Sequence, residues 1–327
     1  MAGRLTILFR AIRTGQRGRL VPRHIVEVSQ FSRGDLEYVF DRADEMRVLR
    51  KPDHRLDGRI LATLFYEPST RTRLSFESAM LRLGGNVIST ENAREFSSAI
   101  KGESVEDTIR IVEGYADAIV IRHYEQGAAA RAASVAAVPI LNAGDGPGEH
   151  PTQALLDLYT IRHELGRIDD LRIALVGDLR YGRAVRSLAM LLTQSTGIEL
   201  VFVSPPEVQM REDVRQALRY AGIPFRDEGD LAAAVDGVDV VYQTRIQKER
   251  FGSEEAYARN KGIYIVNEVT MTRLPSSSIV MHPLPRVDEI SPSFDSDPRA
   301  KYFDEARNGV YVRMALLESL LIGDWSD

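Results

Sequence analysis

The sequence predicts an α/β fold of two doubly wound domains, each a mostly parallel sheet flanked by helices. Short, almost wholly apolar runs, typical of buried parallel strands, alternate along the chain with segments whose apolar residues recur at helical spacing. The length of 327 residues corresponds to about two domains. Because the alternation of strand and helix is repeated in the second half, we expect each half to form its own sheet.

The expected elements of the first half are, in order, a helix over 33–49 capped by Ser32, a strand over 60–65, a helix ending at Gly84-Gly85, a strand over 86–90, a helix over 104–115, and strands over 117–122 and 138–142. Those of the second half are a helix from Pro151, a strand over 171–176, a helix over 184–192, a strand over 199–204, a helix over 211–221, strands over 238–244 and from 279, and a long helix over 302–322.

Composition narrows the class of protein. A formal net charge of −5 gives no support for a nucleic-acid-binding or membrane role, and no apolar run approaches the roughly 20 residues that span a bilayer. The chain has no cysteine, which excludes disulfide and thiolate chemistry and permits a reducing compartment, expected to be the cytoplasm.

The first 23 residues form a basic segment with six arginines and no acidic residue. We interpret residues 1–23 as a flexible tail or a contact arm. An organelle transit peptide is an alternative, because such peptides are rich in arginine and poor in acids. A cloning remnant is another, since Leu20-Val21-Pro22-Arg23 resembles a protease-cleavage linker.

An anion-binding turn is predicted between the strand over 60–65 and the helix that follows. Three hydroxyls, of Ser69, Thr70 and Thr72, and the guanidiniums of Arg71 and Arg73 lie within five residues. The N-terminus of a helix also presents unpaired N–H groups and the positive end of the helix dipole. The pattern therefore favours a phosphate site, although a helix cap beside a solvated charge run is the alternative.

Further polar residues follow strands and so belong to the carboxyl edge of a sheet, where open α/β sheets bind ligands. Arg122 ends a strand, and His150 and Gln153 begin a helix whose dipole favours a neutral imidazole. In the second half, Arg183 and Arg245 also follow strands, and two such arginines suit a ligand with two carboxylates. No Gly-x-Gly-x-x-Gly turn precedes Arg183, so a dinucleotide is not expected.

Three motifs together resemble the aspartate and ornithine carbamoyltransferase family. They are the run from Ser69 to Arg73 with Ser75-Phe76-Glu77, the string His150-Pro151-Thr152-Gln153, and the string His282-Pro283-Leu284-Pro285-Arg286. The resemblance covers about residues 23–323, and the second and third motifs are similar to the aspartate branch. It implies transfer of the carbamoyl group of carbamoyl phosphate to L-aspartate, a step of pyrimidine synthesis, with neither a metal nor an organic cofactor.

The resemblance also implies residue roles. It implies that the catalytic residues are Arg71, Thr72, Arg122 and His150. It implies that carbamoyl phosphate is bound by these four residues and by further ones, which are Ser69, Thr70, Gln153, the carbonyls of Pro283 and Leu284, and Ser97 and Lys101 from a neighbouring chain. It implies that L-aspartate is bound by Lys101, Arg183, Arg245 and Gln247. By itself, the polar stretch over 91–103 that holds Ser97 and Lys101 is read as a loop, either functional or a solvated connector.

The organisation implied by the resemblance is a carbamoyl-phosphate-binding domain over 1–149, an aspartate-binding domain over 150–298 and a C-terminal helix over 299–327 that returns to the first domain. A homotrimer with active sites shared between chains is implied as well, while association with a regulatory chain or dihydroorotase stays open. There are two competing hypotheses. One is a carbamoyltransferase that acts on ornithine, and the other is a non-catalytic homologue that binds phosphate compounds.

Overall fold

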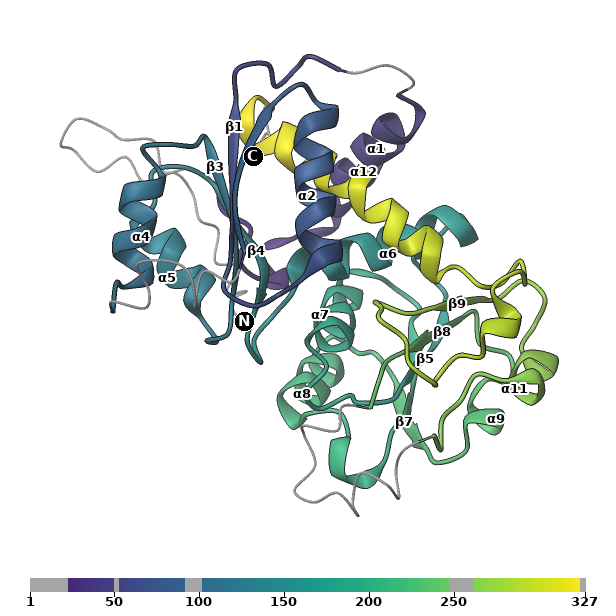
Figure 1. Cartoon of the computed structure of the whole chain (residues 1–327). Helices are drawn as coiled ribbons and strands as arrows, with labels where there is room; N and C mark the ends of the chain where they lie inside the picture. The colour runs from purple at the N-terminus through teal and green to yellow at the C-terminus, as the bar shows by residue number, and fades with distance from the viewer. Residues whose placement is uncertain (1–22, 50–52, 92–101, 247–261, 324–327) are drawn as a thin grey trace, which may run out of the picture. The chain divides into compact units, whose positions relative to one another are not determined.

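The chain folds into two α/β units, each built on one parallel sheet (Figure 1). The computed structural model describes residues 23–49, 53–91, 102–246 and 262–323. Unit 1 comprises residues 1–152 with 310–327, and unit 2 comprises residues 153–309. The predicted fold class is confirmed.

The sheet of unit 1 has the strand order β2-β1-β3-β4, with every neighbouring pair parallel. The strands are β1 (Ile60–Phe65), β2 (Asn86–Glu91), β3 (Ala118–His123) and β4 (Ile140–Asp145). The helical segments are η1 (Val28–Gln30), α1 (Arg33–Val48), α2 (Thr70–Arg82), α4 (Val105–Val112) and α5 (Ala128–Val135). Helices α4 and α5 cover one face, and α1 and α2 the other (Figure 1). The central strands β1 and β3 are thus buried on both faces, which explains their almost unbroken apolar sequence.

The sheet of unit 2 has the order β7-β6-β5-β8-β9 and is also parallel throughout. The strands are β5 (Arg172–Val176), β6 (Glu199–Val203), β7 (Phe225–Glu228), β8 (Val240–Gln243) and β9 (Ile279–Met281). The helical segments are α6 (Pro151–Leu165), which begins in unit 1, α7 (Arg183–Leu191), η3 (Leu192–Gln194), η4 (Pro206–Val208), α8 (Glu212–Tyr220), α9 (Leu231–Ala234), α11 (Glu268–Arg273) and η6 (Pro292–Phe294). Buried side chains of α9 and α11 pack with Val176, Val241 and Val280 in one apolar core.

The last helix, α12 (Tyr302–Leu321), starts in unit 2 and ends in unit 1. Within unit 1, the Glu318 carboxylate accepts from Arg42 Nε at 2.9 Å and also pairs with Arg55. Arg313 Nη1 donates to Ser75 Oγ of α2 at 2.8 Å. The predicted return of the C-terminal helix to the first domain is therefore confirmed.

Two details differ from the expected elements. Strand β4 continues to Asp145, three residues beyond its expected end, because its main chain still pairs with β3 after a bulge, with His123 opposite Asp145. Strand β7 and helices α5, α9 and α11 have no counterpart among the expected elements. No helix in the described part of the chain is both long and apolar enough to cross a membrane.

Candidate active site

Three adjacent strands of unit 1 bring the predicted phosphate-binding residues to one edge of the sheet. Strand β1 leads into the N-terminus of α2, β3 carries Arg122 near its end, and β4 leads through a short loop to His150. Since these strands are parallel neighbours, their carboxyl ends lie at the same edge. Open α/β sheets bind ligands at this edge.

The start of α2 lacks the hydrogen bond of an ordinary side-chain cap. Ser69 is the N-cap residue, yet its side chain accepts no capping hydrogen bond. Thr72 is buried, whereas Thr70 and Arg71 are exposed. No described acidic group pairs with Arg71. The helix N-terminus thus keeps a hydroxyl and a guanidinium available beside its own N–H groups.

Arg73 does not share this availability, which corrects its predicted place in the anion-binding turn. Its Nη2 lies 2.8 Å from Glu91 Oε2, and its Nη1 lies 3.4 Å from Ser89 Oγ. The side chain of Glu77 also approaches it, at 4.0 Å. Arg73 therefore ties α2 to β2 and neutralises carboxylates of unit 1.

Arg122 is held from two sides at the end of β3. Its Nη1 donates to the carbonyl of Ala143 at 3.1 Å, and its Nη2 lies 3.3 Å from Glu67 Oε2. The side chain is only 14% exposed. These contacts fix the plane of the guanidinium next to the β1–α2 turn, because Glu67 belongs to that turn.

The loop between β4 and α6, which positions His150, is organised by Asp145. The carboxylate of Asp145 accepts from Gly127 N and Glu149 N, each at 2.8 Å. Gly146 has a φ of +52°, and a Cβ there would lie 2.2 Å from the carbonyl oxygen of Tyr124. His150 is buried and directly precedes α6. Asp145 is not among the residues predicted from the sequence, although a lone acid among glycines is a typical loop-organising residue.

Unit 2 repeats this arrangement with three other strands. Strands β5, β8 and β9 are adjacent and parallel, and their carboxyl ends lead to Arg183, Arg245 and the Pro283-Leu284 turn, respectively. Arg183 is the first residue of α7, and both arginines are half-buried. The structure therefore places Arg183, Arg245, Pro283 and Leu284 at one edge of one sheet.

A glycine and a buried acid shape the turn that leads to Arg183. Gly177 has a φ of +107°, and a Cβ on it would lie 2.2 Å from the carbonyl oxygen of Thr244, the residue that precedes Arg245. Asp178 Oδ1 accepts from Arg180 N and Tyr181 N, at 3.1 and 2.8 Å. The β5 and β8 turns are thus in contact, and Thr244 N and Oγ1 also donate to the Val176 carbonyl, each at 2.8 Å.

The turn after β9 is held by His282. Its Nδ1 accepts from Leu284 N at 2.7 Å, so the ring proton lies on Nε2, which donates to Glu289 Oε1 at 2.8 Å. Leu284 has a φ of +53° and is followed by a cis peptide bond to Pro285.

Three predicted site residues, Ser97, Lys101 and Gln247, lie outside the described residues. Gln153 is described, and its Nε2 donates to Asp157 Oδ1 at 2.8 Å. Asp157 is fully buried, and the sequence analysis did not single it out. In the described ranges, no group of three or more histidine and acidic side chains could hold a metal ion.

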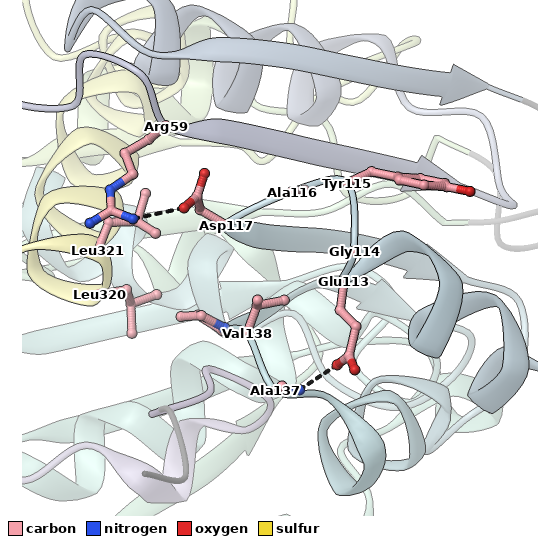
Figure 2. Close-up of a pocket in the computed structure, with 11 residues that line it drawn as sticks. Arg59, Glu113, Gly114, Tyr115, Ala116, Asp117, Ala137, Val138, Leu320 and Leu321 are labelled. Atoms are coloured by element: carbon pink, nitrogen blue, oxygen red, sulfur yellow. Dashed lines mark hydrogen bonds and ion pairs between the residues drawn. The ribbon is translucent and has the colours of Figure 1, made fainter. Parts of the chain in front are cut away.

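A surface hollow of about 540 Å³ lies at the opposite, amino edge of the unit 1 sheet (Figure 2). It is lined by residues that precede β1, β3 and β4 and by the end of α12, among them Arg59, Asp117, Val138 and Leu321. Arg59 Nη1 pairs with Asp117 Oδ1 at 2.7 Å (Figure 2). The hollow contains none of the predicted site residues.

Comparison with known families places both halves of the chain. Residues 23–163 match the model for the aspartate/ornithine carbamoyltransferase carbamoyl-P binding domain, and residues 169–320 match the Asp/Orn binding domain of the same family. The chain belongs to the aspartate/ornithine carbamoyltransferase family. Within this family, the chain is similar to several aspartate carbamoyltransferases.

The chloroplastic aspartate carbamoyltransferase of Oryza sativa subsp. japonica is 54% identical over 308 residues, which cover 91% of this chain and 85% of the relative. The catalytic subunit of M. jannaschii aspartate transcarbamoylase superposes with a TM-score of 0.86 at 47% identity, covering 93% of this chain and 99% of the other. The Trypanosoma cruzi enzyme in complex with N-(phosphonacetyl)-L-aspartic acid superposes with a TM-score of 0.86 at 42% identity, covering 92% and 96%.

Proposed function

We propose that this chain is an aspartate carbamoyltransferase, which transfers the carbamoyl group of carbamoyl phosphate to L-aspartate and releases phosphate. The observation that carries the proposal is that a chain of this family has a carboxyl sheet edge rich in anion donors in unit 1 and a carboxyl sheet edge bearing two arginines in unit 2. Aspartate has two carboxylates, whereas ornithine offers an ammonium group that Arg183 and Arg245 would repel.

Unit 1 binds the phosphate and the carbonyl oxygen of carbamoyl phosphate. The phosphate dianion accepts hydrogen bonds from the hydroxyls of Ser69 and Thr70, from the guanidinium of Arg71 and from the N–H groups at the start of α2. Thr72, Arg122 and His150 donate to the carbamoyl oxygen, on which negative charge builds during attack by the amine. Losing one such donor typically costs on the order of a hundredfold in rate.

Unit 2 binds the carbamoyl nitrogen and aspartate. Gln153 and the carbonyls of Pro283 and Leu284 accept from the carbamoyl NH₂ group. Arg183 binds the α-carboxylate, and Arg245 with Gln247 binds the β-carboxylate. Because the amine must reach the carbamoyl carbon, the proposed reaction requires residues of both units to serve one active site.

The chemistry needs no nucleophile from the protein. The amine nitrogen of aspartate bonds to the carbamoyl carbon, the bond from that carbon to the phosphate oxygen breaks, and phosphate leaves with the electron pair. The leaving phosphate is itself a base and accepts the proton that the amine loses. The main task of the protein is to hold both substrates in contact, which by itself lowers the barrier substantially.

The chain acts as a homotrimer in which Ser97 and Lys101 of one subunit complete the site of the next. This proposal rests on the family resemblance, as does the cytoplasmic location. A mass measurement in solution tests the trimer, and imaging of a fluorescent fusion with and without residues 1–22 tests the location. Whether a regulatory chain or dihydroorotase binds is tested by the same mass measurement in a cell extract.

The direct test of activity compares L-aspartate and L-ornithine as acceptors with purified protein. We expect N-carbamoyl-L-aspartate and phosphate to appear in equal amounts, with no product from ornithine. Product from ornithine alone would support the competing ornithine transferase. No product from either acceptor, in a folded protein that binds carbamoyl phosphate, would support a non-catalytic homologue.

A further inference from the structure

A cluster of buried acids lies behind the carbamoyl-binding residues of unit 2. Asp157 of α6, Glu305 of α12 and Tyr242 of β8 are each at most 1% exposed. Tyr242 Oη donates to Asp157 Oδ2 at 2.6 Å. Gln153 Nε2 lies 2.8 Å from Asp157 Oδ1 and 3.5 Å from Glu305 Oε1, so the two carboxyl groups face the same amide and adjoin each other. All three residues belong to unit 2.

The hydrogen bonds of the cluster decide where its proton lies. Burial raises the pKa of Glu305 well above its usual value, and the charge of Asp157 raises it further. Two adjoining buried carboxyl groups cannot both ionise without strong repulsion. Asp157 accepts from Tyr242 at 2.6 Å and from Gln153 at 2.8 Å, whereas the side-chain contact of Gln153 with Glu305 is longer, at 3.5 Å. The stronger donors therefore place the charge on Asp157, and Glu305 is the neutral acid that donates to it.

The charged member of the pair sets the orientation of Gln153. Gln153 and Asp157 are four residues apart on α6 and therefore share a face of the helix. Asp157 Oδ1 can only accept, so the group of Gln153 that faces it at 2.8 Å must be the NH₂ group. The amide oxygen is then left for another partner. A carbamoyl NH₂ group needs such an acceptor.

The neutral member holds the neighbouring turn. Glu305 Oε2 accepts from the main-chain N of His282 at 2.8 Å. His282 directly precedes Pro283, and its ring binds Leu284 N. The same pair of acids thus supports both Gln153 and the turn that carries the Pro283 and Leu284 carbonyls.

We propose that the buried Asp157–Glu305 pair, sharing one proton, is a positioning device that makes unit 2 present only hydrogen-bond acceptors to the carbamoyl NH₂ group. The inference rests on the proposed function and extends it to selectivity. Acetyl phosphate has the same phosphate and carbonyl groups but a methyl in place of NH₂. The pair should therefore help the protein to distinguish carbamoyl phosphate from acetyl phosphate.

The test measures the KM of carbamoyl phosphate and the inhibition constant of acetyl phosphate in four proteins. In Asp157→Asn, the asparagine can face Gln153 with either its oxygen or its NH₂ group, so Gln153 is free to turn over. We expect the KM of carbamoyl phosphate to rise on the order of tenfold, with the acetyl phosphate constant changed less than about twofold. Glu305→Gln should keep the KM of carbamoyl phosphate within about threefold of the wild type, because glutamine can donate to Asp157 and accept from His282 N and gives up only the 3.5 Å contact from Gln153 Nε2.

Thr160→Val is the matched control, because it removes another buried hydrogen bond between α6 and α12. In that bond, Asn308 Nδ2 donates to Thr160 Oγ1 at 3.0 Å. It should lower stability without changing the ratio of the two constants. An unchanged ratio in Asp157→Asn, an equal change in Thr160→Val, or a loss in Glu305→Gln as large as in Asp157→Asn would overturn the proposal.

A second measurement is independent of catalysis and of whether Asp157→Asn folds. The infrared C=O stretch of a protonated carboxyl group should be present in the wild type at neutral pH and absent in Glu305→Gln. Its absence from the wild type would refute the shared proton. If the wild type transfers no carbamoyl group to aspartate, the proposed function fails, and the infrared band still decides whether the pair exists.

Discussion

Arg73 and Glu91 form an ion pair, with 2.8 Å between Nη2 and Oε2, that joins the first turn of α2 to the end of β2. Arg71, two residues earlier on the same helix, has no described acidic partner. Two arginines that look equivalent in the sequence therefore have different tasks. Arg73 belongs to the framework of unit 1, whereas Arg71 remains available to an anion.

This difference predicts opposite effects of the same substitution. Arg71→Gln should raise the KM of carbamoyl phosphate by roughly tenfold to a hundredfold, because charge-assisted hydrogen bonds are lost, and should leave the unfolding temperature nearly unchanged. Arg73→Gln should leave this KM within about threefold and lower the free energy of unfolding by about 0.5–1 kcal/mol. Steady-state kinetics and urea unfolding check both. Equal kinetic losses in the two variants would contradict the assignment.

A second pair of variants tests the contact between the β5 and β8 turns. Gly177→Ala would place a Cβ 2.2 Å from the Thr244 carbonyl oxygen at a φ of +107°, so it should destabilise the protein by about 2–4 kcal/mol. It should also raise the KM of aspartate, because both turns carry an arginine. Gly222→Ala is the control, since Gly222 has a φ of +73° with open space around it. It should cost about 1 kcal/mol and leave the KM unchanged.

The stability of unit 1 should depend on pH through His24. Burial lowers the pKa of His24 from 6.5 to about 4, and its Nδ1 accepts from Ile140 N at 3.1 Å. Since the folded pKa lies below the unfolded one, the unfolded chain takes up the proton first as the pH falls. The contribution to stability is complete above about 6.5 and is lost between 6.5 and about 4.

Urea unfolding at about pH 7.5 and about pH 4.5 measures this loss, which should be on the order of 2–3 kcal/mol for His24. His24→Asn provides the comparison, because its side-chain oxygen can accept the same N–H group but does not titrate. The difference between the two proteins should shrink or change sign at the lower pH. A difference that is the same at both pH values would rule out His24 as the titrating group.

Sharing of active sites between subunits predicts complementation. Lys101→Ala and Arg71→Ala should each be nearly inactive. When the two are unfolded together and reassembled, some sites of the mixed oligomers receive Arg71 from one chain and Lys101 from another. Part of the activity should then return. If mixed oligomers verified by native mass spectrometry stay inactive, each site is contained within one chain.

Elements could be predicted from sequence most clearly where burial produces a regular apolar pattern. Strands β1, β3 and β5 are buried on both faces and read as continuous apolar runs. Strand β7, with the sequence Phe-Arg-Asp-Glu, lies at an edge of the sheet and is half exposed. Its sequence therefore has no apolar pattern that would predict a strand. Helices α5, α9 and α11 have four to eight residues, too few for helical spacing to be recognised.

Site residues could be predicted where a motif ties a residue type to a strand end, as at Arg122 or Arg183. Residues that only position other site residues could not be predicted in this way. Asp145 and Asp157 are ordinary acids in the sequence, and their importance comes from partners far along the chain, such as Gly127 for Asp145 and Tyr242 for Asp157. The separate tasks of Arg71 and Arg73 also depend on Glu91, which follows in another strand.

The proposed function requires the anion donors of unit 1 and the arginines of unit 2 to serve one active site. N-(phosphonacetyl)-L-aspartic acid joins a phosphonate to aspartate and can engage both sets at once. Isothermal titration should show one molecule bound per chain, with affinity reduced at least about tenfold in both Arg71→Gln and Arg245→Gln. Unchanged affinity in either variant would contradict a single site built from both units.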